Sequence, residues 1–270
     1  MKKNFSGDLR DIIFASIKEE RFEAKITANE NGVVVGIKKV VVKAEELGID
    51  IETYVEDGDE VKVNEVLIKV IGDPKQLALA EDHLMGLLGK YSGIVTAARK
   101  AKELAGKRLK VVSGGWKKMP GVLKRSLREA IKLGGLTPRM TNKPFIYLDK
   151  NYVRMFGGIE ETLLAVGSID RASVIQVKGE FKSIAEEVLA AANNGAEVIM
   201  VDTGILEDCH TASQVLREED LRDDVKLAFG GGIKISEIPQ LRDEDIEIID
   251  VGREIVDAPL LDLSFDVIFE

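Results

Sequence analysis

The chain has 270 residues, of which 45% are hydrophobic and 31% are charged, a composition typical of a globular protein with one large domain or two modest ones. Its net charge of −9 argues against a general nucleic-acid binder or a membrane-surface protein. The single cysteine, Cys209, excludes an internal disulfide, and neither a signal peptide nor a membrane-spanning apolar run is visible, so we expect a cytoplasmic protein.

The first hundred residues are predicted to mix helices with short antiparallel strands. The spacing of apolar residues predicts helices over 7–20, 37–47 and 74–91, with Ser6 and Asp73 as caps and Gly48 as a stop. A break at Ser92-Gly93 is expected before a helix resumes over 95–104. Alternating apolar residues predict strands over 22–26, 33–35, 49–55, 61–63 and 66–71, with a hairpin turn at Asn31-Gly32.

After Gly106 the pattern changes to alternating strands and helices. Short apolar runs predict strands over 109–112, 145–148, 174–177, 198–201, 225–229 and 246–251. Helices are predicted between them over 122–133, 159–166, 184–193 and 209–218, with short ones over 233–241 and from Ala258. This alternation indicates a parallel sheet, either a truncated barrel or an open doubly wound sheet.

A last strand is predicted near the C-terminus, over 261–269, where it could return to the first domain. The predicted domains are therefore residues 1–105, joined by the C-terminal strand 262–270, and residues 106–261.

Three consecutive glycines, Gly230 to Gly232, follow one of the predicted strands and precede a short helix. Glycines let a ligand approach the backbone, and a helix N-terminus carries partial positive charge, so this turn is a candidate anion site. The next predicted strand ends at Gly252 in the same way. Two such turns in succession resemble the phosphate-binding loops of a βα barrel, although they would also suit ordinary turns.

Positive charge is concentrated between Lys107 and Lys143, where the only acid is Glu129. The segment holds eleven cations: Lys107, Arg108, Lys110, Lys117, Lys118, Lys124, Arg125, Arg128, Lys132, Arg139 and Lys143. A charged run often forms a solvated surface, but glycines, a proline and Trp116 interrupt this one. We therefore favour a basic pocket for a polyanion such as pyrophosphate.

Several motifs in order along the chain resemble the quinolinate phosphoribosyltransferases, also called nicotinate-nucleotide pyrophosphorylases (carboxylating). These are 55–72, Ser92-Gly93-Ile94-Val95-Thr96, Pro120-Gly121 with Ala130-Ile131 and Gly134-Gly135, Gly231-Gly232-Ile233, Val251-Gly252, and 257–264. The resemblance implies an α/β fold, with an N-terminal α+β sandwich domain and a truncated parallel βα barrel of the type II phosphoribosyltransferase kind. It also implies a homodimer, or a higher oligomer, whose active site is shared between subunits.

The chain departs from the family's motifs at several positions. It has Glu81-Asp82 for Glu-Arg, Gly115-Trp116-Lys117-Lys118 for Thr-Arg-Lys-Thr, Pro138-Arg139 for His-Arg, Asp149-Lys150-Asn151-Tyr152 for Lys-Asp-Asn-His, and Gln176-Val177-Lys178 for Glu-Val-Glu. Carboxylates at Asp82 and Asp149 would repel a dicarboxylate, and Trp116 could stack on a cationic ring. We therefore expect an acceptor other than quinolinate, one that is cationic or amine-bearing and is bound by these three residues. In the alternative, Asp82 and Asp149 point away from the site and pair with lysines.

The residues that match the family's motifs are assigned to phosphoribosyl pyrophosphate, the co-substrate that the resemblance implies. Lys117, Arg139, Asp202 and the glycine loops with Gly231, Gly232 and Gly252 carry over directly, Lys118 lies in the same motif, and Lys124 replaces an arginine after Pro-Gly. Asp202 ends a predicted strand, where barrel catalytic residues lie, and is a candidate ligand for Mg²⁺ or for the ribose hydroxyls.

Lys178 stands where the family has a carboxylate, and three roles remain open for it. It could replace the charge of the metal and hold pyrophosphate, pair with Asp202 and silence the site, or form a Schiff base. With Asp202, Lys178 and Lys117 as catalytic residues, the sequence predicts a phosphoribosyltransferase acting on a small molecule. The alternatives are a genuine quinolinate enzyme of NAD biosynthesis and a non-catalytic relative that binds a phosphorylated ligand.

Overall fold

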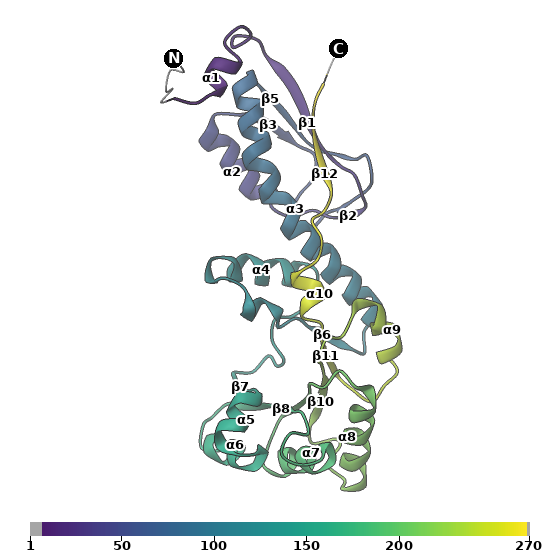
Figure 1. The fold of residues 1–270 in the computed structure, drawn as a ribbon. Helices are drawn as coiled ribbons and strands as arrows, with labels where there is room; N and C mark the ends of the chain where they lie inside the picture. Colours follow the sequence, from purple (N-terminus) through teal and green to yellow (C-terminus); the bar gives the residue numbers. More distant parts are fainter. Residues whose placement is uncertain (1–6, 269–270) are drawn as a thin grey trace. The chain divides into compact units, whose positions relative to one another are not determined.

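The structure, a computed structural model, describes residues 7–268 and divides the chain into two compact units. Unit 1 contains the described residues up to Thr96 and those from Ala258 onward, and unit 2 contains Ala97–Asp257. The first division falls inside the long helix α3 (Pro74–Ala105), whereas the sequence placed the boundary at Gly106, just after this helix (Figure 1). The second division likewise falls a few residues before the predicted end of the second domain.

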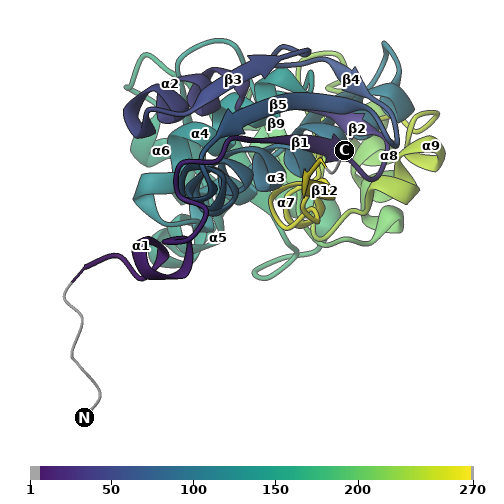
Figure 2. The same cartoon turned by 90° about the horizontal axis from the view of Figure 1, so that it is seen from above.

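Unit 1 is built on a four-stranded antiparallel sheet with the order β12-β1-β5-β3 (Figure 2). The strands are β1 (Phe22–Ala28), β3 (Asp50–Thr53), β5 (Val66–Gly72) and β12 (Leu263–Val267). The last strand pairs with the first from Leu263 opposite Ala28 to Val267 opposite Ala24. The predicted return of the C-terminal strand to the first domain is therefore confirmed.

The predicted hairpin at Asn31-Gly32 is wrong. Strand β2 (Gly32–Val33) does not pair with β1 but with β4 (Glu60–Val61). The Asn31 side chain accepts a hydrogen bond from the amide of Val63 at 3.0 Å, which ties this turn to the chain beyond β4. Asn-Gly is a local turn signal, and it does not determine which strand becomes the partner.

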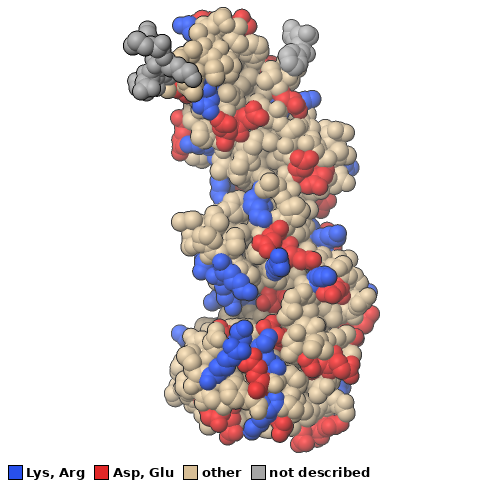
Figure 3. Space-filling model, viewed as in Figure 1, with Lys and Arg blue, Asp and Glu red and all other residues tan. Residues whose placement is uncertain are grey.

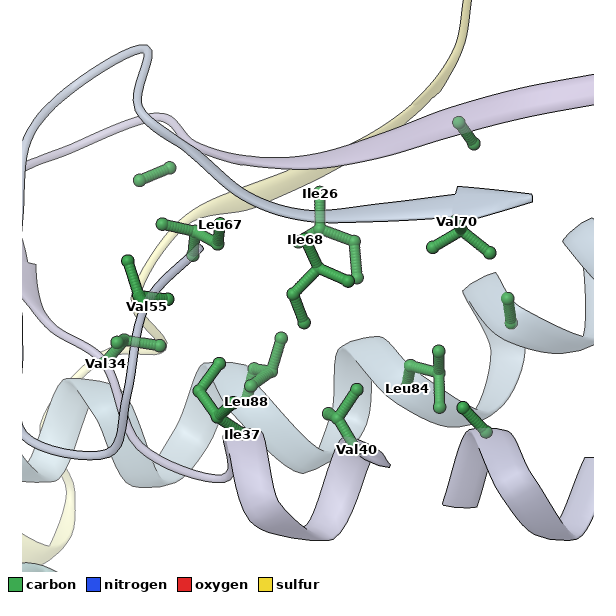
Figure 4. Close-up of a cluster of buried hydrophobic side chains, with 14 of the residues drawn as sticks. Ile26, Val34, Ile37, Val40, Val55, Leu67, Ile68, Val70, Leu84 and Leu88 are labelled. Carbon is green, nitrogen blue, oxygen red and sulfur yellow. The ribbon is translucent and has the colours of Figure 1, made fainter. Parts of the chain in front are cut away.

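Two helices cover one face of the unit 1 sheet and bury its core. Helix α2 (Ile37–Leu47) ends at Gly48, whose φ of 67° lies in the left-handed region that glycine adopts without strain, as predicted. Ile37 and Val40 of α2 and Leu84 and Leu88 of α3 pack against apolar side chains of the sheet, such as Ile68 (Figure 4). This layer of helices on an antiparallel sheet is the predicted α+β domain.

The predicted helix over 7–20 is present only as the single turn α1 (Arg10–Ile13). Its apolar residues Leu9, Ile12 and Ile13 are exposed rather than packed. A short helix without tertiary packing is marginal in water, so the apolar spacing alone does not sustain it. Its predicted cap, Ser6, lies outside the described residues.

Helix α3 runs without interruption through Ser92 and Gly93, so the predicted break there is wrong. The Ser92 side chain is fully buried, and its hydroxyl accepts from the amide of Val35 at 2.9 Å and donates to the carbonyl of Val35 at 3.2 Å. A Cβ placed on Gly93 would lie 1.8 Å from the carbonyl oxygen of Pro259. This Ser-Gly pair therefore allows close packing against the helix and does not end it.

Unit 2 contains a six-stranded parallel sheet with the order β6-β11-β10-β9-β8-β7. All six predicted strands are present: β6 (Lys110–Val112), β7 (Phe145–Leu148), β8 (Ala172–Val177), β9 (Val198–Val201), β10 (Lys226–Phe229) and β11 (Ile248–Asp250). Short apolar runs identified them because strands of a parallel sheet are buried on both faces.

Helices connect these strands in the order expected of βα units. The four longer predicted helices are confirmed as α4 (Gly121–Leu133), α6 (Ile159–Val166), α7 (Ile184–Asn193) and α8 (Leu206–Glu218), and α5 (Lys150–Phe156) was not predicted. The predicted helix over 233–241 divides into the 3₁₀ turn η2 (Ile235–Glu237) and α9 (Ile238–Leu241), which has Pro239 in its first turn. A further helix, α10 (Arg253–Val256), ends before Ala258, so the helix predicted from Ala258 is wrong.

The sheet of unit 2 is curled, which decides between the two predicted forms. Both edge strands contribute to one interior cluster, since Val112 of β6 and Phe145 and Tyr147 of β7 pack with Val174, Val198, Met200, Ala228 and Ile248 of the central strands. An open sheet would keep its two edges apart, so the unit is a truncated barrel. Among the described residues, no helix is long and apolar enough to cross a lipid bilayer.

Candidate active site

A cavity of about 600 Å³ lies in unit 2 and is bordered by both edge strands of the sheet. Its lining comes from the end of β6 and the 3₁₀ turn η1 (Gly115–Lys118), from α4, from the segment before β7, from β7 and from the end of β11. The residues are Val112, Gly114, Trp116, Lys117, Arg125, Arg128, Glu129, Lys132, Pro138, Arg139, Met140, Phe145, Tyr147 and Asp250. Barrel strands direct their carboxyl ends at substrates, so this is the candidate site.

The cavity has a clear excess of positive charge. Five of its lining residues are cations, namely Lys117, Arg125, Arg128, Lys132 and Arg139, against the two acids Glu129 and Asp250. One acid is already paired, because Glu129 accepts a hydrogen bond from Nε of Arg125 at 2.9 Å. Lys and Arg side chains gather over α4 in Figure 3. The structure therefore brings part of the basic segment 107–143 to one anion-attracting cavity.

Three of these cations lie over aromatic rings of the same cavity. Lys117 Nζ is 4.1 Å from the centroid of the Tyr147 ring, Arg128 Cζ is 4.9 Å from the Trp116 ring, and Arg139 Cζ is 5.8 Å from the Phe145 ring. A ring face attracts a cation and also restricts its side chain. The arrangement places charged groups on rigid apolar walls, which suits a planar ligand that carries negative charge.

Asp250 lies at the carboxyl end of β11, and its Oδ1 accepts a hydrogen bond from the amide of Gly114 at 2.9 Å. Burial raises the pKa of this carboxyl, partly opposed by the Gly114 amide and by Lys117, and Asp202 adds to the increase. Burial likewise raises the pKa of the Tyr147 phenol, with contributions from Asp202 and Asp250, so this hydroxyl stays protonated at neutral pH.

Replacing Asp250 with asparagine is expected to increase the free energy of unfolding at neutral pH. Because the pKa of Asp250 is higher in the folded chain than in the unfolded one, stability falls as the pH rises from the unfolded pKa to the folded pKa, and it stays reduced above that. The side-chain oxygen of asparagine can still accept the hydrogen bond from the Gly114 amide, and without an ionisable group the protein does not lose stability as the pH rises. Urea unfolding of both proteins at several pH values measures it, and a lower midpoint for Asp250→Asn at pH 7 would contradict the expectation.

Asp202 follows β9, and two donors from β8 and its loop hold it. Lys178 Nζ lies 3.4 Å from Asp202 Oδ2 and also donates to the main-chain oxygen of Asp202. The Gln176 side-chain amide donates to the same Oδ2, and its own oxygen accepts from the amide of Lys150 at 2.7 Å. Of the three roles open to Lys178, the structure contains the pairing with Asp202.

These residues fit poorly with a magnesium ion held by Asp202. Oδ2 of Asp202 already accepts from an ammonium and an amide and has little left for a divalent cation, so this carboxylate could offer a metal only Oδ1, with the Lys178 ammonium close by. Among residues 7–268 there is no group of three or more His, Cys, Asp and Glu side chains placed to bind a metal. A metal here would depend on the phosphates of a substrate for its ligands.

Glycine pairs bring the loops after neighbouring strands into close contact. A Cβ on Gly231 would lie 2.3 Å from the amide nitrogen of Gly204, and a Cβ on Gly115 would lie 2.7 Å from the carbonyl oxygen of Gly252. Gly231 and Gly232 have φ angles of 105° and 99°, which side chains rarely adopt. Within the described part of the chain their amides donate no hydrogen bond, so they are available to an anion.

The structure does not bring all the predicted residues together. Trp116, Lys117 and Arg139 line the cavity. The other predicted phosphate-binding and catalytic residues do not, namely Lys118, Lys124, Lys178, Asp202, Gly231, Gly232 and Gly252. Asp82 belongs to unit 1, where it pairs with Arg10. Asp149 caps α5 by accepting from the amides of Asn151 and Tyr152, so its carboxylate has a structural use.

Several lining residues had no individual role in the sequence prediction, although three of them were counted in the predicted basic pocket. Arg125, Arg128 and Lys132 are spaced three and four residues apart, which places them on one face of α4. That spacing was available in the sequence and would have identified them. Nothing in the sequence indicated Tyr147 or Asp250, because each looks like an ordinary strand residue.

Comparison with known proteins identifies the family. Residues 94–266 match the model of the C-terminal domain of quinolinate phosphoribosyl transferase, and residues 11–92 match that of its N-terminal domain. The chain belongs to the quinolinate phosphoribosyltransferase family. The two matches together span nearly all of the chain, so both units are those of a quinolinate phosphoribosyltransferase-type protein.

Relatives within the family are distant in sequence but align with most of this chain. A probable nicotinate-nucleotide pyrophosphorylase (carboxylating) of Methanothermobacter thermautotrophicus is 28% identical over 255 residues, covering 92% of this chain and 88% of the relative. The human nicotinate-nucleotide pyrophosphorylase (carboxylating) is 26% identical over 251 residues, covering 90% of this chain and 81% of the human protein. The crystal structure of the Pyrococcus furiosus nicotinate-nucleotide pyrophosphorylase has a TM-score of 0.82 at 19% identity, covering 98% of this chain and 78% of that one. That likeness confirms the predicted fold.

Proposed function

We propose that the chain transfers the phosphoribosyl group of phosphoribosyl pyrophosphate to an anionic aromatic acceptor, and that quinolinate is this acceptor. The observation that supports the proposal is the cavity, in which five cations and three aromatic rings surround a space of about 600 Å³. Cations in such a cavity attract carboxylates and phosphates. They would repel the cationic acceptor expected from the sequence, and neither Asp82 nor Asp149 lines the cavity.

In the proposed reaction the ring nitrogen of the acceptor forms a bond to C1 of the ribose. The bond from C1 to the pyrophosphate oxygen breaks, and its electron pair leaves with pyrophosphate. With quinolinate as acceptor, the carboxylate next to the ring nitrogen then leaves as CO2, the electron pair of the broken C–C bond stays on the ring, and a proton from solvent takes that position to give nicotinate mononucleotide. Positive charge develops on the sugar and negative charge on the leaving group, so groups fixed near both stabilise the transition state. Lys117 and the arginines of the cavity are suited to the anions, the amides of Gly231 and Gly232 to the sugar phosphate, and Asp202 to the ribose hydroxyls.

The test is to mix the purified protein with phosphoribosyl pyrophosphate and quinolinate, and to measure pyrophosphate release together with nicotinate mononucleotide. Release that requires quinolinate, with the nucleotide formed, supports the proposal. Binding of phosphoribosyl pyrophosphate without any release would indicate a non-catalytic relative instead. Parallel reactions with Mg²⁺ and with EDTA report the metal requirement.

A second candidate is the same transfer to another anionic ring. Pro138 lines the cavity where the family's motif has histidine, and Trp116 lies where that motif has arginine. The Trp116 indole nitrogen is buried and has no hydrogen-bond partner among the described residues, so its N–H is a donor that a ligand other than quinolinate could satisfy. Release with a different carboxylated ring, and not with quinolinate, would support this candidate. A homodimer with a shared site and a cytoplasmic location both stay predictions.

A further inference from the structure

We propose that Lys178 supplies, as a fixed part of the chain, the positive charge that a divalent cation would otherwise bring to the pyrophosphate end of the site. Phosphoribosyl pyrophosphate would then bind without a metal. The inference rests on the proposed function, because it concerns the same co-substrate. It starts from the contacts of the Lys178 ammonium at the strand ends β8 and β9.

One N–H of the Lys178 ammonium is not used in its contacts with Asp202. Lys178 Nζ carries three N–H groups. Two are directed at the main-chain oxygen and Oδ2 of Asp202. The side chain is 26% exposed and thus not closed off from solvent, and in the proposal the third donor binds a phosphate oxygen of the ligand. An ammonium bound this way is a fixed positive charge next to the carboxylate that was expected to bind the metal.

A buried carboxylate holds the backbone of Lys178 in place. Glu187 on α7 is 3% exposed, and its oxygens accept from the amides of Gly179 at 2.8 Å, Phe181 at 3.0 Å and Lys178 at 3.2 Å. The same loop is fixed to α5 by Glu180, which accepts two hydrogen bonds of 2.7 Å from Arg154. Because the loop is held at both ends, the position of the ammonium does not depend on a ligand.

The surroundings of Asp202 favour the Lys178 ammonium over a bound metal ion as the partner of this carboxylate. Its neighbours from β8 are both donors, the buried Gln176 amide and Lys178 itself. Asp250, at the carboxyl end of β11, accepts from Gly114 and experiences the charges of Lys117 and Lys118. The negative charge at this edge is therefore offset by lysines, and a divalent ion at Asp202 would be repelled by the ammonium already there.

The fluorescence of Trp116, the only tryptophan of the chain, provides a binding signal inside the cavity. Phosphoribosyl pyrophosphate is titrated into the full chain in EDTA and in Mg²⁺. For the natural chain we expect dissociation constants that agree within about threefold. For Lys178→Glu, which places a second carboxylate beside Asp202, we expect binding in EDTA to weaken about a hundredfold and Mg²⁺ to restore part of it.

Two further variants separate this role from general charge effects and from misfolding. Lys178→Met should lose affinity in both conditions, without rescue by Mg²⁺. Lys182→Glu makes the same charge change as Lys178→Glu on the same exposed loop, with no contact to Asp202, and should bind like the natural chain. Thermal unfolding midpoints near that of the natural chain show that each variant is folded.

The outcomes distinguish the inference from the proposed function. Tight binding by the natural chain that requires Mg²⁺ overturns the role of Lys178 and leaves the transferase proposal intact. Equal weakening in Lys178→Glu and Lys182→Glu also overturns it. If the natural chain binds phosphoribosyl pyrophosphate in neither condition, the proposed function fails, and the inference fails with it.

Discussion

Replacing Arg128 and Arg139 together by methionine is expected to lower kcat/KM for phosphoribosyl transfer by about a thousandfold. Both side chains line the cavity and lie over aromatic rings, Arg128 over Trp116 and Arg139 over Phe145. A charge-assisted hydrogen bond contributes about 1.5–3 kcal/mol, and two such bonds correspond to roughly a hundred- to ten-thousandfold. Methionine keeps an apolar chain against each ring, so the loss reports mainly on charge.

Steady-state kinetics of the double variant and of both single variants measure this effect. The matched control is Lys124→Met, which removes a cation from the same helix, α4, without changing the lining of the cavity. Its kcat/KM should stay within about twofold of the natural chain. A loss in Lys124→Met as large as in Arg128→Met would show that general positive charge on α4, and not the cavity, supports the reaction.

The sequence predicted the barrel well because its signal is local. Each strand of unit 2 is a short apolar run, and burial on both faces of a parallel sheet requires such runs. The alternation of those runs with helices then indicates their parallel pairing. The curl of the sheet was not predictable in this way, since it depends on Val112 of one edge and Tyr147 of the other meeting in one interior cluster.

The candidate site was predicted only in part. Lys117 and Arg139 were found because they match the family's motifs, and both line the cavity. Asp149 was assigned to the acceptor, although its carboxylate caps a helix that the sequence analysis did not identify. A side chain's use depends on neighbours that are distant along the chain, and a motif position alone does not reveal them.

The break expected at Ser92-Gly93 shows the same limit for the fold. Serine and glycine are weak helix formers, so propensity indicates an end to the helix at this point. Tertiary contacts reverse that indication, because Ser92 bonds to the backbone of Val35 and Gly93 leaves room for Pro259. The pair is in fact a site of dense packing within unit 1, and this has a measurable consequence.

Replacing Gly93 with alanine is expected to reduce the free energy of unfolding by about 2 kcal/mol. The added methyl group would lie 1.8 Å from the carbonyl oxygen of Pro259 and 3.1 Å from the amide nitrogen of Leu261. These are backbone atoms, so relief requires the chain before β12 to move away from α3, and overpacking of this kind typically costs 1–3 kcal/mol or more. Alanine's better helix propensity, about 1 kcal/mol, offsets only part of this cost.

Chemical denaturation compares this variant with Gly86→Ala, an exposed position two turns earlier in the same helix, where an added Cβ would have no neighbour within 4 Å. That control should be more stable than the natural chain by up to about 1 kcal/mol, because only the propensity term acts. The two substitutions are chemically identical and should therefore change stability in opposite directions. If Gly93→Ala instead stabilised the protein as Gly86→Ala does, the close contact between α3 and the segment leading into β12 would be wrong, and Gly93 would be an ordinary helix residue.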